Sequence, residues 1–248
     1  MLTRLLLGLL GAGVTLLSRR SLTALLEQLS IAYSKQVNPA EALRFLFDLD
    51  NRLYQLQGRM SVAYGNGVHT KHRHMRYHDF FTDRVKNNER VLDIGCGIGA
   101  VAHAVAERAG SQVVGIDLSA ENISKAHELF PHPKITYMVG DALGETPRDY
   151  YDVVILSNVL EHLTGRVSFL RRIQETNCPQ RFLVRVPLFE RDWRVPLKRE
   201  LGIDWFLDSD HETEYTVESF TAEVDEAGLE ITHLEIRWGE IWSELCKK

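Results

Sequence analysis

Three glycines at alternate positions follow a short apolar run at residues 91–99, with the sequence VLDIGCGIG. Glycine allows a tight turn and lets backbone amides approach a ligand, so this segment predicts a strand that turns into a helix beside a nucleotide-like ligand. The glycines alone do not define that ligand, because Gly95, Gly97 and Ala100 also fit the Gly-x-Gly-x-x-Ala pattern of dinucleotide sites.

Three acidic residues narrow the choice of ligand. Asp93 precedes the first glycine by two positions, where its carboxylate can hydrogen-bond the turn or attract an ammonium group but would repel a pyrophosphate. Asp117 ends the next apolar run and can accept hydrogen bonds from both hydroxyls of a ribose. Asp141 follows the third run and can accept from an adenine amino group. The dinucleotide pattern does not require this last acid.

Short β-rich runs alternate with helical stretches from Arg90 onward, which indicates βαβ units around a parallel sheet. We expect a Rossmann-like domain over residues 81–248, preceded by a helical appendage and lid over residues 1–80. The expected strands are 90–94, 112–116, 134–139, 151–156, 181–186, 229–237 and 240–245, and the expected helices are 99–108, 120–130, 163–176 and 217–227.

The glycine segment, Asp117, residues 140–142 (GDA) and residues 152–163 (DVVILSNVLEHL) together resemble the class I S-adenosylmethionine-dependent methyltransferases. The resemblance covers roughly the C-terminal two thirds of the chain. It implies a doubly wound seven-stranded α/β sheet whose last strand is antiparallel, with S-adenosylmethionine as the cofactor. It also implies that the glycines lie under the methionine part, Asp117 at the ribose and Asp141 at the adenine. The cofactor-binding residues we expect are Asp93, Gly95, Cys96, Gly97, Gly99, Asp117, Leu118, Asp141, Ala142 and Asn158.

Two histidines are candidates for a catalytic role. Methyl transfer from a sulfonium is an in-line displacement, so the enzyme aligns the acceptor and, for a hydroxyl, removes its proton. His162 follows the fourth expected strand and can act as that base, or its Glu-His-Leu run can simply cap the next helix. His211 lies in a long acidic connection, which is either part of an acceptor-binding wall or a solvated turn. Trp193 in the same connection can stack on an acceptor or serve in packing.

Four histidines lie within residues 68–78, VHTKHRHMRYH, ahead of the glycine segment. We expect no metal there, because the interleaved basic residues repel a cation, although His74 and His78 would share one face of a helix. Arg73 and Arg76 can instead clamp a carboxylate or phosphate, which suits either the methionine carboxylate of the cofactor or an anionic acceptor. With Tyr77, they are our candidates for substrate binding. This run, with residues 238–241 (WGEI), is more loosely similar to methyltransferases associated with bacterial envelope polysaccharides.

The composition of the 248 residues is that of a globular protein, with 44% hydrophobic and 25% charged residues. A net charge of -5 gives no basic field for a phosphate backbone, so we expect no nucleic-acid partner. The three cysteines are widely spaced, which suggests no disulfide framework and fits a cytoplasmic location.

The N-terminal part is apolar and then helical. Residues 5–17 are leucine-rich and flanked by arginines, but they are too short to span a bilayer, which needs about 20 apolar residues. Their helical spacing fits either peripheral contact with a membrane or packing on the protein itself, and we leave both open. A helix is expected to begin at Pro39 behind an Asn38 cap and to end at Gly58. Its expected core face is Leu43, Leu46, Phe47, Leu53 and Tyr54.

The sequence therefore predicts transfer of a methyl group from S-adenosylmethionine to an oxygen or nitrogen of a small molecule, with a sugar or lipid-linked glycan as one candidate acceptor. A protein substrate is left open. Oxygen is mildly favoured, because the Asn-Pro-Pro-Tyr motif of some amino-methylating enzymes is absent after the fourth strand. The alternatives are an NAD-dependent oxidoreductase and a non-catalytic scaffold that binds the cofactor and a partner or membrane. The sequence specifies neither the acceptor nor the oligomeric state.

Overall fold

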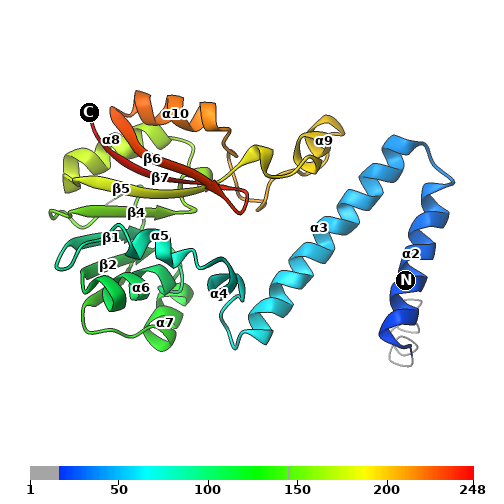
Figure 1. Ribbon diagram of the computed structural model, residues 1–248, viewed down its shortest axis with the longest axis horizontal. Coiled ribbons are helices and arrows are strands. Elements are labelled where there is room, and N and C mark those ends of the chain that lie inside the picture. Colours follow the sequence, from blue (N-terminus) through cyan, green and yellow to red (C-terminus); the bar gives the residue numbers. More distant parts are fainter. Residues whose placement is uncertain (1–16, 145) are drawn as a thin grey trace. The chain divides into compact units, whose positions relative to one another are not determined.

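The structure is a computed structural model that describes residues 17–144 and 146–248 (Figure 1). The described chain forms two compact units. The first comprises the residues up to Met60 together with Lys198–Asp204, and the second comprises Ser61–Leu197 and Trp205–Lys248. The leucine-rich segment expected to form an interfacial or packed helix lies almost wholly outside the described residues. In the described part of the chain, no helix is both long and apolar enough to cross a membrane.

The second unit is built on a seven-stranded sheet in the order β3-β2-β1-β4-β5-β7-β6 (Figure 1). Strand β7 is antiparallel to both of its neighbours, while β1 to β5 are mutually parallel. This topology confirms the expected fold. The strands are β1 (Arg90–Ile94), β2 (Gln112–Asp117), β3 (Ile135–Val139), β4 (Val153–Ser157), β5 (Arg181–Pro187), β6 (Leu229–Arg237) and β7 (Glu240–Lys247).

Helices cover both faces of the sheet, because successive strand residues point to opposite sides. On one face, strand residues such as Leu92 and Val154 pack against α8 and α10. On the other, residues such as Val91 and Ile155 pack against α5, α6 and α7. These helices are α5 (His78–Thr82), α6 (Ala100–Ala109), α7 (Ala120–Leu129), α8 (Arg166–Asn177) and α10 (Val217–Glu226); α4 (Lys71–Met75), α9 (Arg194–Glu200) and the 3-10 turns η1 (Leu160–His162) and η2 (Phe189–Arg191) lie in the connections.

The order of the strands reverses direction at β1. The chain proceeds outward from β1 through β2 to β3 and then returns to β4 on the other side of β1. In open α/β sheets such a switch point leaves a crevice outside the carboxyl ends of the strands, where ligands bind. The glycine turn after β1 and the connection after β4 both open at this place.

The first unit contains α2 (Arg19–Ser34) and most of α3 (Pro39–Tyr64). As predicted, α3 begins after Asn38, whose side-chain oxygen accepts a hydrogen bond of 3.0 Å from the Glu41 backbone N–H. The expected end at Gly58 is wrong, because the helix continues to Tyr64. The left-handed residues that follow this helix are Asn66 and Gly67.

The expected core face of α3 is only partly correct. Phe47 is buried, together with Ala42, which was not expected there. Leu46, Leu53 and Tyr54 are exposed. The apolar spacing that suggested a buried face therefore does not give a continuous core, because a period of 3.6 residues shows which residues share a face but not what that face meets.

Candidate active site

The glycine turn requires glycine for conformational reasons. Gly95, Gly97 and Gly99 have φ values of 68°, 54° and 84°, in the left-handed region that side chains with a Cβ seldom adopt. A Cβ on Gly99 would also lie 2.5 Å from the Tyr137 hydroxyl oxygen. The backbone N–H groups of Gly95 and the next residue, Cys96, donate to the carbonyl of Ile116, at 2.8 and 3.0 Å, which ties the turn to β2.

Asp117 holds the turn from the end of β2. Its carboxylate accepts hydrogen bonds from the backbone N–H of Gly97 at 2.8 Å, the backbone N–H of Ser119 at 2.9 Å and the side-chain amide of Asn122 at 3.1 Å. Charge-assisted hydrogen bonds of this kind fix the orientation of a carboxylate. The acid is therefore preorganised at the edge of the crevice.

Asp93 is buried beneath the same turn. Its Oδ2 atom makes no hydrogen bond to any described residue. Burial, and then the charge of Asp117, raise the pKa of Asp93 to about 8. Burial likewise raises the pKa of the Cys96 thiol, so this cysteine stays protonated. Both buried side chains therefore stay uncharged at neutral pH.

A pocket of about 390 Å³ opens beside the turn. It brings together six of the residues expected to bind the cofactor, whereas Asp93, Cys96, Gly97 and Gly99 lie beneath or within the turn. The described residues that line it are Ile94, Gly95, Ile116, Asp117, Leu118, Asn122, Gly140, Asp141, Ala142, Leu143, Asn158, Val159, His162, Leu163, Phe169 and Asp210.

Two polar residues occupy the pocket at the ends of β3 and β4. Asp141 accepts a hydrogen bond of 2.8 Å from the Leu143 backbone N–H through Oδ1. Asn158 has a left-handed backbone with φ 58°, which turns the chain sharply after β4. Its side-chain amide donates to Glu161 at 2.8 Å, and its oxygen accepts from Arg185. Asn158 thus connects the pocket to Glu161 on one side and to Arg185 on the other.

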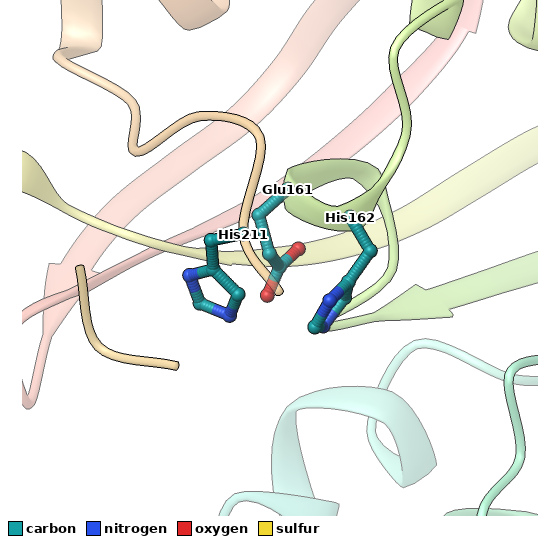
Figure 2. A group of neighbouring side chains, drawn as sticks. All are labelled: Glu161, His162 and His211. Carbon is teal, nitrogen blue, oxygen red and sulfur yellow. The ribbon is translucent and has the colours of Figure 1, made fainter. Parts of the chain in front are cut away.

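Glu161, His162 and His211 lie together beside this pocket, and of the three His162 lines it (Figure 2). The imidazole rings of His162 and His211 lie edge to face, with centroids 4.6 Å apart. Figure 2 shows the Glu161 carboxylate beside the two rings. The two histidines that the sequence presented as rivals therefore belong to one cluster. They come together because η1 and the connection after α9 pack against each other, through the backbone N–H of Glu212, which donates to the Glu161 carbonyl at 2.8 Å.

The interpretation of the Glu-His-Leu run as a helix cap does not hold. Helix α8 begins at Arg166 with Gly165 at its N-cap, whereas Glu161 and His162 lie in the separate turn η1. The side chains are thus not used to cap α8, and they face His211 instead.

The pKa values of Glu161 and His211 are both raised, but for different reasons. Burial raises the pKa of Glu161, which has no exposed surface. Burial alone would lower the pKa of His211, but the neighbouring carboxylates of Glu214, Glu161 and Asp208 outweigh it, so the pKa of His211 is raised. A fourth acid, Asp210, lies 3.3 Å from Nδ1 of His162. The cluster is therefore surrounded by negative charge.

The residues expected to bind the acceptor lie elsewhere. None of the four candidates lines the pocket; these are Arg73, Arg76, Tyr77 and Trp193. Arg76 forms an ion pair with Asp79, and Trp193 has 70% of its surface exposed. Tyr77 is buried under the Arg185 guanidinium, and Arg73 lies over the ring of Tyr64. Their role in acceptor binding stays a prediction.

The histidine run is also arranged differently from the expectation. His74 and His78 do not share one helix, because α4 ends at Met75 and α5 begins at His78, with Arg76 in a left-handed conformation between them. Burial lowers the pKa of His78 to about 4 and that of His72 to about 3, which keeps both rings neutral.

A buried ion pair behind Asn158 was missed by the sequence analysis. Arg185 of β5 lies 3.4 Å from the Glu240 carboxylate of β7 and donates to Asn158, and both charged residues are buried. An arginine within an otherwise apolar strand was the signal available, because buried charges are rarely found unpaired.

Comparisons with known proteins agree with this geometry. Residues 68–234 match the family model described as a methyltransferase domain. The chain belongs to this methyltransferase family. That membership confirms the predicted class I S-adenosylmethionine-dependent methyltransferase and its methyl donor, and it favours them over the NAD-dependent alternative.

Among curated relatives, this methyltransferase is 29% identical over 165 residues to a ubiquinone biosynthesis O-methyltransferase of Bradyrhizobium sp. (strain ORS 278), covering 60% of this chain and 64% of that one. It is 33% identical over 112 residues to norajmaline N-methyltransferase of Rauvolfia serpentina, covering 42% and 38%. Each match spans less than two thirds of the relative's own length.

A solved structure with the same fold is an O-methyltransferase from neocarzinostatin biosynthesis, in complex with S-adenosylhomocysteine and 1,4-dihydroxy-2-naphthoic acid. The TM-score is 0.52 at 19% sequence identity, and the match covers 64% of this methyltransferase and 49% of that chain.

Proposed function

We propose that this methyltransferase transfers the methyl group of S-adenosylmethionine to a hydroxyl oxygen of a small molecule. The observation that carries the proposal is the composition of one pocket: Asp117 and Asp141 line it together with His162, which belongs to the Glu161–His162–His211 cluster. A site for an adenosyl group and a site for proton removal are therefore adjacent. An oxygen acceptor is supported further by the relation to O-methyltransferases of ubiquinone biosynthesis.

Each wall of the pocket has a role in this proposal. Asp117 accepts hydrogen bonds from the ribose hydroxyls, Asp141 and Ala142 contact the adenine, and Leu118 packs against the nucleoside. The glycine turn approaches the methionine part. Asn158 closes the pocket between the cofactor and the Glu161 carboxylate, to which it donates a hydrogen bond.

The chemical step is an in-line displacement. The acceptor oxygen forms a bond to the methyl carbon while the carbon–sulfur bond breaks, and the sulfonium becomes the thioether of S-adenosylhomocysteine. The acceptor proton passes to His162, whose side chain is 32% exposed and reaches the pocket. Alignment of the two reactants supplies most of the acceleration, and proton removal adds to it.

The acceptor class is open to direct test. The relatives include one N-methyltransferase, so nitrogen acceptors belong in the same screen. The sugar or lipid-linked glycan expected from the looser resemblance stays a prediction, as does contact of the N-terminal segment with a membrane. Membership of the methyltransferase family argues against the non-catalytic scaffold.

The first experiment is calorimetric titration of the purified chain with S-adenosylmethionine, S-adenosylhomocysteine and NAD in parallel. We expect saturable binding of the two sulfur compounds and none of NAD.

Transfer of labelled methyl groups to phenols, sugars and amines then identifies the acceptor. With a working acceptor, His162→Gln should lower kcat by about 100-fold or more and leave S-adenosylhomocysteine affinity unchanged, whereas the exposed His74→Gln control should do neither. Binding of NAD alone would overturn the proposal.

A further inference from the structure

The Glu161–His162–His211 cluster has the composition of a metal site. Each residue offers one ligand atom, and these three atoms lie within 4.8 Å of one another. Among the described residues, this is the one group of three or more histidine, cysteine or acidic side chains that meets this condition. Two imidazoles and one carboxylate form a donor set that first-row divalent ions bind in proteins.

Hydrogen bonds within the protein leave part of this cluster unsatisfied. Glu161 is fully buried, yet its Oε2 atom has no hydrogen-bond partner among the described residues. Its other oxygen accepts from Asn158 and is thereby held in place. A buried carboxylate oxygen without a partner is unfavourable, and a bound cation satisfies it.

Both histidines have a carboxylate near the same ring nitrogen. Nδ1 of His162 lies 3.3 Å from Asp210, and Nδ1 of His211 lies 3.5 Å from Glu214 without a hydrogen bond to any described residue. Metal-binding histidines commonly direct their second nitrogen toward a carboxylate, which orients the ring and increases the electron density at the ligating nitrogen. The arrangement leaves Nε2 of each ring as the ligand, with Asp208 3.7 Å from Nε2 of His211 as a further acid beside the site.

We propose that Glu161, His162 and His211 bind one divalent first-row transition metal ion at the wall of the pocket, with coordination positions open to the acceptor. Three protein ligands leave room for further oxygen ligands, as in metal sites that activate a substrate. Magnesium and calcium fit less well, because they prefer all-oxygen coordination.

The effect of the ion on the acceptor rests on the proposed function, which it makes more specific. An acceptor hydroxyl that coordinates the ion loses its proton more readily. Because His162 is then a metal ligand, it no longer acts as the base, and the acceptor proton passes instead to Asp210, which lines the pocket and is exposed to water. An acceptor with two adjacent oxygens can occupy two open positions, so vicinal diols and catechols form the substrate class that this site would select.

Metal binding is measured first, without any acceptor. The full chain is stripped with a chelator, dialysed and titrated with Co²⁺, whose visible absorption reports coordination by protein ligands, and with Zn²⁺, Mn²⁺ and Mg²⁺ by calorimetry. We expect one high-affinity Co²⁺ or Zn²⁺ per chain and at least tenfold weaker binding of Mg²⁺. No saturable binding of any transition metal would overturn the proposal.

Variants locate the site. His162→Gln is the first choice, because this side chain is partly exposed and its replacement leaves the core intact. Glu161→Gln is the second and keeps an oxygen for the Asn158 hydrogen bond. Each should weaken Co²⁺ binding by more than tenfold, while the control His74→Gln should not. Wild-type affinity in both variants, with S-adenosylhomocysteine binding retained as evidence of folding, would contradict the assignment.

Activity then separates the two proposals. Stimulation of methyl transfer to catechols by the bound ion supports its action on the acceptor. Metal binding at these residues with transfer unaffected by the chelator would overturn that action and leave the methyltransferase proposal intact. If S-adenosylhomocysteine fails to bind, the proposed function is wrong, and the Co²⁺ titration still decides the metal site.

Discussion

The Asp117 carboxylate accepts a hydrogen bond of 2.8 Å from the backbone N–H of Gly97, so the end of β2 holds the turn that leaves β1. The same carboxylate lines the pocket. One side chain therefore both shapes the glycine turn and lines the pocket, so a simple deletion of this carboxylate would disturb both.

Asp117→Asn is expected to weaken binding of S-adenosylhomocysteine by about 1–3 kcal/mol, or roughly 5- to 150-fold in Kd, because an amide cannot accept charge-assisted hydrogen bonds from both ribose hydroxyls. The side-chain shape is preserved, which limits the effect on the turn. Calorimetric titration measures the change. Asp225→Asn, at an exposed carboxylate on α10, serves as the control and should bind like the wild type. Unchanged affinity in a folded Asp117→Asn protein would exclude the ribose role.

Asp93 should make stability depend on pH. Its pKa is raised to about 8, so the folded chain keeps this proton between roughly pH 4 and pH 8, where the unfolded chain loses it. The folded state then binds more protons, and this carboxyl lowers the free energy of unfolding as the pH rises through that window.

Asp93→Asn removes this titration. The variant should therefore gain stability relative to the wild type between pH 5.5 and pH 7.5, by up to about 1.4 kcal/mol per pH unit. Urea unfolding at several pH values measures the difference. The Asp225→Asn control should keep the wild-type slope, and parallel profiles for Asp93→Asn and the wild type would show that Asp93 is ionised in the folded protein.

Gly99 should tolerate a methyl group less well than Gly97. Both have positive φ, which costs a residue with a Cβ about 1–2 kcal/mol. A Cβ at Gly99 would in addition lie 2.5 Å from the Tyr137 hydroxyl, whereas nothing lies within 4 Å of a Cβ at Gly97. Gly99→Ala should thus lose about 1–3 kcal/mol more than Gly97→Ala in urea unfolding. Equal losses would mean that Tyr137 moves away freely.

Arg185→Met should strongly destabilise the protein, by about 3–5 kcal/mol, because it leaves the buried Glu240 carboxylate without its counter-ion. The double variant Arg185→Met with Glu240→Gln should recover part of that loss. A double-mutant cycle from urea unfolding tests the coupling. If the two losses simply add, the pair does not interact in the way its 3.4 Å separation indicates.

The sequence by itself determined the sheet domain and the acidic residues that line the pocket. The structure of residues 91–99 can be predicted locally, because an apolar strand followed by glycines at alternate positions can form few structures other than a tight turn into a helix. Asp117 and Asp141 then follow from topology, since parallel strands bring their carboxyl ends to one edge.

Tertiary structure decided the rest. His211 joins Glu161 and His162 only because a long connection folds back over η1, and local patterns contain no information on such a distant contact. Gly58 lies within α3, and the left-handed turn that ends this helix forms at Asn66 and Gly67 instead. Glycine permits a left-handed conformation but does not require one. The sequence thus specified which residues turn and which acids end strands, while packing between distant segments determined which side chains meet.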